Sequence, residues 1–235
     1  MNIAIVGYGK MGREVEKILL KANHTIHTII DDSNALSLIK TSSPQKSVPS
    51  SKALCIDFTT PDAFRKNYKL IADKFAGAVV GTTGWYDILP KVKKYFSIKK
   101  KKLVYGTNFS VGVNILFEIT DYASSLLYGL GYNSYIVELH HKEKKDAPSG
   151  TGITLKSILD KNLKFNTPVS SVRSGYIKGI HDIGFESSVD KINIRHEAYS
   201  REGFAMGAVL AAIWLEKTEG IWDFRELFKQ NIKSK

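Results

Sequence analysis

The sequence has very little cysteine, with Cys55 as the single thiol among 235 residues. One cysteine excludes a disulfide framework and is typical of a reducing compartment. Because Cys55 lies in the apolar run 53–56, we expect a small core residue there and not a reactive thiol. No apolar stretch approaches the roughly 20 residues of a membrane span, and no cationic leader precedes the strand-like start. We therefore expect a cytoplasmic protein without a membrane partner.

Acidic residues are also scarce relative to basic ones, which leaves a formal net charge of +11. A basic chain can bind nucleic acid, a membrane surface or an acidic small molecule. The excess is mostly lysine, scattered apart from the run 99–102, which precedes an apolar segment and predicts a solvated loop. Nucleic-acid readers usually add arginine and exposed aromatic residues in a recognisable module, and none is found. No nucleic-acid partner is therefore expected.

Strand-like and helix-like segments alternate through the first half of the chain. Short continuous apolar runs predict buried strands at residues 2–7, 25–30, 53–58, 76–81 and 103–109. Helical spacing of apolar residues predicts helices after the first strand, at 61–74 and at 86–95. This order is typical of an α/β fold, a Rossmann-type parallel sheet with helices on both faces. Residues 33–52, rich in Ser, Thr, Pro and Lys, predict a surface loop with at most one short helix.

The second half of the chain follows a different order. A long helix is predicted from 113 to about 130, then a strand at 134–141 and a helix that opens near Thr151. Two more strand-like stretches, 180–187 and 191–199, are separated by a turn-like Ser-Val-Asp, so we expect them to pair antiparallel. The chain ends with two predicted helices, an apolar one at 204–217 and an amphipathic one at 222–231.

These segments predict two domains, and no internal repeat is found. A dinucleotide-binding domain is expected at residues 1–109, completed by residues 206–235. An α+β domain with a mostly antiparallel sheet is expected at residues 110–205.

The glycine motif at residues 7–12 follows a strand and opens a helix. In dinucleotide-binding folds the first glycine allows a tight turn, the second lets the backbone approach a pyrophosphate, and the third lets helix and strand pack closely. The helix N-terminus favours phosphate groups. Asp31 stands nineteen positions beyond Gly12, where such folds place an acid on a ribose hydroxyl. A plain glycine turn is the alternative, because the motif alone is weak.

A second candidate site lies in residues 138–152, where two histidines and three lysines precede the predicted helix start. Lysine charge and the N–H groups of a helix N-terminus suit carboxylates, and an adjacent histidine suits proton transfer. Neighbouring strand residues point to opposite faces, so His140 and His141 enter one pocket only if the strand bends. Taken singly, either histidine is more often structural than catalytic. Glu138 and His140 share a face, but no third ligand follows at a typical spacing, so no metal site is expected.

Residues 138–151 resemble the E-x-H-H-x-x-K-x-D-x-P-S-G-T signature of the dihydrodipicolinate reductase family, the 4-hydroxy-tetrahydrodipicolinate reductases. The family's other blocks stand in the same order, at residues 7–12, 56–59, 81–84, 108–114 and 201–208. Collinear blocks over nearly the whole chain are far more specific than any single motif. The glycine loop is one residue shorter than in many relatives, which bears on loop geometry and not on the fold.

The resemblance implies a nicotinamide cofactor. The contacts implied are Gly7, Tyr8, Gly9, Lys10, Met11, Gly12, Asp31, Gly81, Thr82, Thr83, Gly106, Thr107, Asn108 and Phe109. Asp31 would hold the adenosine ribose, and the loops after two strands would border the nicotinamide. Asp31 and its neighbour Asp32, where many relatives carry arginine, would repel the 2′-phosphate of NADPH. We therefore expect a preference for NADH without exclusion of NADPH.

The resemblance also implies the reaction and its residues. His140 corresponds to the family's proton donor and Lys144 to its second catalytic residue. The groups that would hold the substrate's carboxylates are His141, Ser149, Gly150 and Thr151. The implied substrate is a cyclic imine dicarboxylate, reduced to tetrahydrodipicolinate in the diaminopimelate–lysine pathway. Family analogy further implies that the antiparallel sheet mediates a homotetramer, which physical reasoning on the sequence does not show.

Two other classes of protein compete with this interpretation. A different Rossmann oxidoreductase would need another catalytic block, for example a cysteine nucleophile, and Cys55 is poorly placed for that role. A nicotinamide-sensing regulator would usually add a helix-turn-helix that reads DNA, and none is visible.

Overall fold

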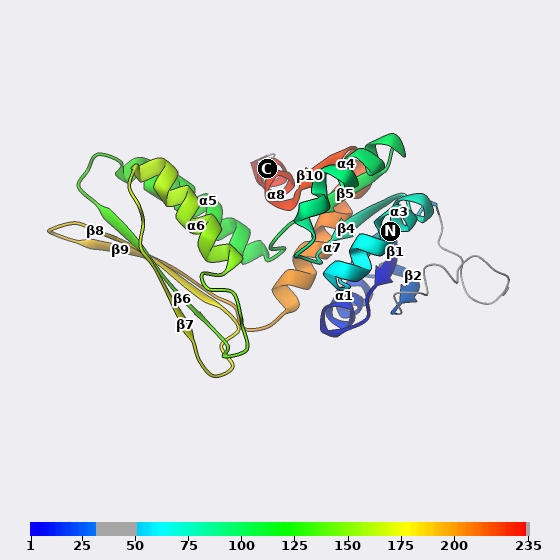
Figure 1. Ribbon diagram of the computed structural model, residues 1–235, viewed down its shortest axis with the longest axis horizontal. Helices are drawn as coiled ribbons and strands as arrows, with labels where there is room; N and C mark the ends of the chain where they lie inside the picture. Colours follow the sequence, from blue (N-terminus) through cyan, green and yellow to red (C-terminus); the bar gives the residue numbers. More distant parts are fainter. Residues whose placement is uncertain (32–50, 234–235) are drawn as a thin grey trace. The chain divides into compact units, whose positions relative to one another are not determined.

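The computed structural model describes residues 1–31 and 51–233, and these divide into two compact units (Figure 1). Unit 1 comprises Met1–Ser110 and Phe204–Lys235, and unit 2 comprises Val111–Gly203. The surface loop predicted at 33–52 lies outside the described residues except for its last two positions, and Asp32 lies outside them as well. Among the described helices, none is long and apolar enough to cross a membrane.

Unit 1 is built on a six-stranded sheet in which each neighbouring pair of strands is parallel. Its order is β10 (Ile221–Asp223), β5 (Lys102–Tyr105), β4 (Gly77–Val80), β3 (Leu54–Asp57), β1 (Asn2–Val6) and β2 (Thr25–Ile30). Strands β3 and β4 are buried at every residue, as expected for parallel strands covered on both faces. The predicted Rossmann-type parallel sheet is therefore confirmed.

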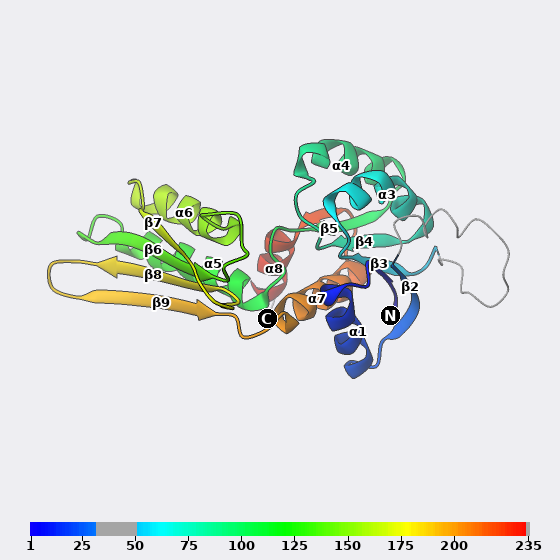
Figure 2. The same ribbon diagram turned by 60° about the horizontal axis from the view of Figure 1, so that its bottom comes forward.

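Helices cover both faces of this sheet. They are α1 (Lys10–Lys21), α3 (Pro61–Lys74), α4 (Leu89–Ile98), α7 (Glu202–Lys217) and α8 (Phe224–Lys233). Figure 2 shows α3 and α4 on one face, and α1 and α7 on the other. Helix α3 begins at the predicted residue, where Thr60 accepts a hydrogen bond from the N–H of Ala63 at 3.2 Å and proline occupies the first turn.

Three sequence-based boundaries in unit 1 are wrong. The helix predicted at 86–95 is a 3-10 turn at Tyr86–Ile88 followed by α4, which continues to Ile98. The strand predicted at 103–109 ends at Tyr105, and residues 106–109 form a loop. The helix predicted from 222 starts instead at Phe224, because Ile221–Asp223 pairs with β5 as an edge strand. Three-residue pairing of this kind leaves no periodicity for a sequence to reveal.

Unit 2 contains a four-stranded sheet in the order β7 (Val169–Arg173), β6 (Asn133–His140), β8 (Ile180–Glu186) and β9 (Lys191–Glu197). The β6–β8 and β8–β9 pairs are antiparallel, which confirms a mostly antiparallel sheet. Strand β7 pairs parallel with β6 and was not predicted, because it is short and alternates between half-buried and exposed positions. Helices α5 (Val111–Leu127) and α6 (Gly150–Leu163) pack together on one face of the sheet (Figure 1).

The helix-covered face of this sheet forms the apolar core of unit 2, and its side chains become polar toward the carboxyl end of β6. Burial alternates along β6, so Ile136, Glu138 and His140 share the face that packs on the helices. Ile136 belongs to a core cluster with residues of α5, α6 and β8, including Leu155 and Phe185. The last two inward positions of β6 therefore place a carboxylate and an imidazole at the end of an apolar core.

Candidate active site

The glycine loop of unit 1 is tight at both ends and open in its middle. Gly7 has φ +89°, and a Cβ there would lie 2.6 Å from the carbonyl oxygen of Phe58. A Cβ at Gly12 would overlap the carbonyl oxygen of Gly7, whereas a Cβ at Gly9 would meet nothing within 4 Å. The backbone around Gly9 therefore has free space beside it, which fits the close approach of a pyrophosphate. Lys10 is exposed and Met11 half-buried at the first turn of α1.

Asp31 lies beside this loop, at the end of β2. The backbone N–H of Tyr8 donates to Asp31 Oδ1 at 2.8 Å, and the N–H of Gly7 donates to the carbonyl of Ile30 at 2.7 Å. The Tyr8 hydroxyl donates to Glu16, and the Arg13 guanidinium lies over the Tyr8 ring at 4.6 Å. The fold thus brings the acid predicted to bind ribose next to the loop predicted to bind pyrophosphate.

Two further candidate loops follow the adjacent parallel strands β4 and β5. Thr82 is buried, and its hydroxyl donates to Asp57 Oδ1 at 2.6 Å, while Thr83 is exposed. Asp57 ends β3, is 1% exposed, and also accepts hydrogen bonds from the N–H and hydroxyl of Thr59 at 3.2 and 3.0 Å. Burial raises the pKa of Asp57 to about 6, against the opposing effect of these hydrogen bonds. Sequence reasoning did not select Asp57, although an acid that ends an apolar strand before threonine was a visible signal.

The loop after β5 presents mainly backbone groups to a possible ligand. Gly106 is buried, Thr107 is exposed and Asn108 Oδ1 accepts the N–H of Ser110 at 2.8 Å. The Phe109 ring is 2% exposed and stacks on Phe224, with centroids 4.5 Å apart. The Phe109 side chain is therefore part of the core of unit 1, and any ligand contact at this position falls to the main chain.

Glu138 in unit 2 is a fully buried carboxylate surrounded by donors. It accepts from the N–H of Ser149 at 2.9 and 3.0 Å and from the Ser149 hydroxyl. The Ser171 hydroxyl donates to it at 2.9 Å and Arg173 Nη2 at 2.6 Å. Burial favours a raised pKa, but the donors from Ser149, Arg173 and Ser171 outweigh it and lower the pKa of Glu138 to about 2. The carboxylate is therefore ionised at any physiological pH.

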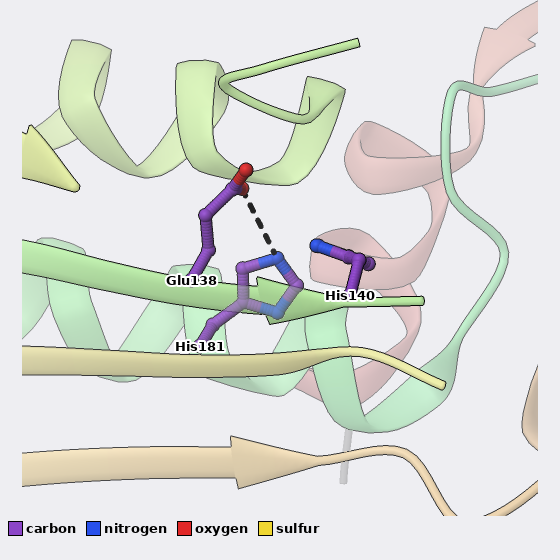
Figure 3. Close-up of side chains that lie close together, drawn as sticks. All are labelled: Glu138, His140 and His181. Atoms are coloured by element: carbon purple, nitrogen blue, oxygen red, sulfur yellow. Dashed lines mark ion pairs between the residues drawn. The ribbon is translucent and has the colours of Figure 1, made fainter. Parts of the chain in front are cut away.

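His140 lies beside His181 of β8, a residue that sequence reasoning missed. The two ring centroids are 5.2 Å apart. Figure 3 shows the His140 ring beside that of His181, and a dashed line from His181 to the Glu138 carboxylate, 3.8 Å away. Burial lowers the pKa of His140 to about 4 and that of His181 to about 3. The positive charges of Lys144 and Arg173 act on His140 in the same direction. His140 is therefore a neutral imidazole at pH 7 unless an anion binds beside it.

The remaining candidates of unit 2 lie in the segment between β6 and α6. Strand β6 ends at His140, so strand alternation does not apply to His141, whose carbonyl accepts the N–H of Lys144 at 3.1 Å. The Lys144 ammonium is paired with Asp146 Oδ1 at 2.7 Å. Ser149 caps α6 by accepting the N–H of Gly152 at 3.1 Å, and Gly150 and Thr151 form the first turn. The predicted catalytic and carboxylate-binding residues thus belong to one continuous stretch of unit 2.

A potential cation-binding arrangement also appears in unit 2. Ligand atoms of Glu138, His140 and His181 lie within 4.8 Å of one another. The sequence showed no third ligand beside Glu138 and His140. His181 takes that place in the structure, but it lies too far along the chain to match a typical spacing of metal ligands. Both oxygens of Glu138 already accept hydrogen bonds, however, and Arg173 adds a positive charge at 2.6 Å. These neighbours favour a hydrogen-bonded carboxylate over a bound cation.

Comparison with known proteins covers both units. Residues 1–109 match the family described as dihydrodipicolinate reductase, N-terminus, and residues 112–228 match dihydrodipicolinate reductase, C-terminus. The chain is 35% identical over 250 residues to the 4-hydroxy-tetrahydrodipicolinate reductase of Christiangramia forsetii, with 100% of both chains covered. It is 34% identical to the protein of the same name from Thermosipho africanus, with 98% of this chain and 99% of that one covered. Dipicolinate-bound dihydrodipicolinate reductase from Paenisporosarcina sp. TG-14 has the same fold, with a TM-score of 0.76, 19% identity, and coverage of 95% of this chain and 97% of that one.

Proposed function

The chain belongs to the dihydrodipicolinate reductase family, and on that premise we propose that it reduces 4-hydroxy-tetrahydrodipicolinate with a reduced nicotinamide cofactor. The match of both units to one family carries this proposal. It is supported by the open glycine loop of unit 1 and by the proton-transfer and cationic groups of residues 138–151 in unit 2. The reaction belongs to lysine biosynthesis through diaminopimelate, and we propose the cytoplasm as its location.

Unit 1 would hold the cofactor, which supplies a hydride to the substrate. The loop around Gly9 would receive the pyrophosphate, and Asp31 would accept a hydrogen bond from a ribose hydroxyl. The loops 81–83 and 106–109 would border the nicotinamide, since open parallel sheets bind ligands at the carboxyl ends of their strands. Asp57 supports this assignment because its carboxylate accepts a hydrogen bond from the Thr82 hydroxyl and so fixes a residue of the first loop.

Unit 2 would hold the substrate and move a proton. Loss of the 4-hydroxyl group and a ring proton as water leaves a conjugated imine, which accepts the hydride at a ring carbon. Protonation of the resulting enamine completes the reduction, and we assign that proton to His140. Binding of a dianionic substrate beside this buried, neutral imidazole raises its pKa, so that it takes up the proton it later donates.

The cationic and helix-terminal groups of unit 2 would bind the two carboxylates. Lys144 is held by Asp146 in the structure, so a substrate carboxylate would exchange places with that side chain. The turn at Ser149, Gly150 and Thr151 opens α6, and a helix N-terminus favours an anion. His141, half-buried just beyond β6, would contact the other carboxylate.

We propose NADH as the preferred cofactor, with NADPH accepted. Asp31 and Asp32 would place two negative charges near a 2′-phosphate, and close like charges cost about 1 kcal/mol or more even when screened. Asp32→Arg is expected to shift the ratio of kcat/KM values toward NADPH. A wild-type preference for NADPH by tenfold would refute this assignment and leave the reaction intact.

We also propose a homotetramer that uses the open face of the four-stranded sheet. Tyr135, Val137 and Leu139 of β6 alternate with the core residues and so lie on that face, beside the exposed Val172 of β7. A gel-filtration mass equal to one 26.2 kDa chain would contradict the assembly.

The reaction itself is tested by following cofactor absorbance with freshly generated hydroxy-tetrahydrodipicolinate. The purified chain should oxidise NADH only when this substrate is present, and the product should be tetrahydrodipicolinate by mass spectrometry. Absence of oxidation with both NADH and NADPH would refute the proposed function.

A further inference from the structure

A group of hydrogen-bonded side chains lies at the end of β6, here called the Glu138 cluster. It is formed by the buried Glu138, Ser149 and His181 and the half-buried Arg173. Resting on the proposed function, we propose that Glu138 is a positioning residue that acts through Ser149 and Arg173. It holds the turn that opens α6 ready for a substrate carboxylate, and it sets the orientation of His181 against His140. Glu138 itself would touch neither substrate nor cofactor.

The Ser149 hydroxyl has its full complement of partners in this cluster. A hydroxyl has one proton to donate, and its acceptor is Glu138, because an ionised carboxylate only accepts. The same oxygen accepts the N–H of Gly152 at 3.1 Å and lies 3.3 Å from His181 Nε2. Because the hydroxyl proton is already engaged, His181 Nε2 must be the donor in that contact. The charge on Glu138 thus dictates which nitrogen of His181 carries the proton.

Glu138 also anchors the backbone of the segment that carries the proposed catalytic lysine. Its carboxylate accepts the N–H of Ser149 directly, at 2.9 Å. Arg173 Nη2 bridges from Glu138 Oε1 to the carbonyl of Asp146, at 2.6 Å on each side. One buried charge therefore holds residues 146 and 149, on either side of the bend that leads into α6. Lys144 is paired with Asp146, so the same anchoring limits where its ammonium can lie.

Loss of the charge at Glu138 would act on geometry more than on packing. Glutamine fills the same volume, but the Ser149 N–H donates to both carboxylate oxygens, so in either orientation the amide NH2 would face that donor. In one of the two orientations it would also face the Arg173 guanidinium. A buried donor left without an acceptor costs about 1–3 kcal/mol, so the turn before α6 should shift to find one. Since a misplacement of about 1 Å in a positioning group can cost about 10²-fold in rate, a shifted turn should also hold the substrate carboxylate less well.

The test is Glu138→Gln in the full-length protein, compared with wild type by kinetics and by calorimetric titration of pyridine-2,6-dicarboxylate. We expect the KM for substrate and the Kd for the dicarboxylate to rise by roughly 5- to 100-fold, the equivalent of one lost buried partner. The KM for NADH should change by less than about twofold, because unit 1 is untouched. Glu138→Asp, which keeps the charge, should recover part of the dicarboxylate affinity.

The matched control is Ser134→Ala on the same face of the same strand. Ser134 is 2% exposed, and its hydroxyl is hydrogen-bonded to the Thr167 hydroxyl at 3.0 Å, at the other end of β6. This variant should lower the unfolding midpoint while leaving the substrate KM and the dicarboxylate Kd at wild-type values. If Glu138→Gln and Ser134→Ala lose similar stability but only Glu138→Gln loses affinity for the dicarboxylate, Glu138 positions the site and does not merely support the sheet.

A second variant tests the route through Ser149, and it also serves if Glu138→Gln does not fold. Ser149→Ala should raise the dicarboxylate Kd, and a double variant should lose little beyond the more affected single one, since coupled residues are not additive. Unchanged dicarboxylate affinity in either single variant would overturn the inference. The titration does not depend on turnover. An inactive wild type that still binds the dicarboxylate would refute the proposed reaction, and the dicarboxylate Kd values of the variants would still decide the positioning role.

Discussion

Unit 1 and unit 2 differ in how many polar side chains they bury. Among the described residues, buried polar side chains number three in unit 1: Asp57, Thr82 and Ser110. Unit 2 is the smaller and has nine: Asn114, Thr120, Ser124, Ser134, Glu138, His140, Ser149, Thr167 and His181. In unit 1 the candidate ligand contacts are mostly main-chain groups at the ends of strands, which a parallel sheet supplies without burying charge. In unit 2 they are side chains on a core face, and each needs a partner.

This difference predicts how the two units respond to substitution. Main-chain sites tolerate side-chain changes except where a Cβ would occupy the space of a ligand or a neighbouring strand. Side-chain sites fail when one charge or one hydrogen bond is removed, because the partner is then left unpaired in a desolvated place. The experiments below separate these two kinds of failure.

The largest effect is expected from His140→Gln in unit 2. It removes the proposed general acid, so kcat should fall by about 10²–10⁴-fold, while the KM for NADH stays near its wild-type value. His141→Gln is the neighbouring comparison and should raise the substrate KM more than it lowers kcat. Steady-state kinetics on both variants shows which histidine mainly affects kcat and which mainly affects the substrate KM. If His141→Gln is the more impaired in kcat, the two roles are reversed.

Removing the Lys144 ammonium should have the next largest effect. Lys144→Ala leaves a bound carboxylate without its cation. The resulting fall in kcat/KM should correspond to a loss of about 2–5 kcal/mol of transition-state stabilisation. Pyridine-2,6-dicarboxylate should inhibit the wild type and inhibit this variant poorly. The control is Lys145→Ala, an exposed lysine one position away, which should behave as wild type. Equal inhibition of Lys144→Ala and wild type would remove Lys144 from the site.

Acidification should weaken unit 2 and favour the folded state of unit 1. His140 and His181 have folded pKa values of about 4 and 3, below the ordinary 6.5, because burial disfavours their charged forms. Their contribution to stability is complete above pH 6.5 and is lost as the pH falls toward those values, by about 1–2 kcal/mol for each at pH 5. Asp57 has a raised pKa of about 6, so its contribution is present below pH 3.8 and is lost as pH rises through 6.

Hydrogen exchange followed by mass spectrometry at pH 7.5 and pH 5, corrected for the intrinsic exchange rate, measures each unit separately. Protection of β6 and β8 should fall on acidification more than protection of β1 and β3. His181→Asn should reduce the difference, since it removes one of the histidines whose pKa burial lowers. The same loss of protection in both units would contradict the assignment.

The smallest effects should come from two glycines of the same loop in unit 1. Gly12→Ala brings a Cβ onto the Gly7 carbonyl oxygen, and such overpacking should cost about 1–3 kcal/mol in the free energy of unfolding. Gly9→Ala meets nothing within 4 Å, so the unfolding midpoint should be unchanged while the KM for NADH rises. Denaturant unfolding and kinetics together make the comparison. A Gly9→Ala enzyme with a wild-type KM for NADH would show that no pyrophosphate approaches there.

Local sequence pattern predicted unit 1 well because its elements are strongly periodic. Strand β2 spans Thr25–Ile30 and helix α3 spans Pro61–Lys74, both as predicted from an apolar run and from helical spacing of apolar residues. The glycine loop was visible because its three glycines stand at a fixed spacing between a strand and a helix. The antiparallel hairpin of β8 and β9 was also visible, because its turn residues are local.

The Glu138 cluster was not visible, because its members come from four separate segments of unit 2. Glu138 and His140 were noticed as neighbours on one face of β6, but the partners that determine their chemistry are Ser149, Arg173 and His181. Arg173 ends a strand too short and too polar to be recognised, and His181 is an ordinary histidine in its own segment. Only the pairing of β7 and β8 against β6 brings Arg173 and His181 next to Glu138 and His140, and burial in that sheet lowers the pKa values of the two histidines. The order of residues along the chain does not encode either effect.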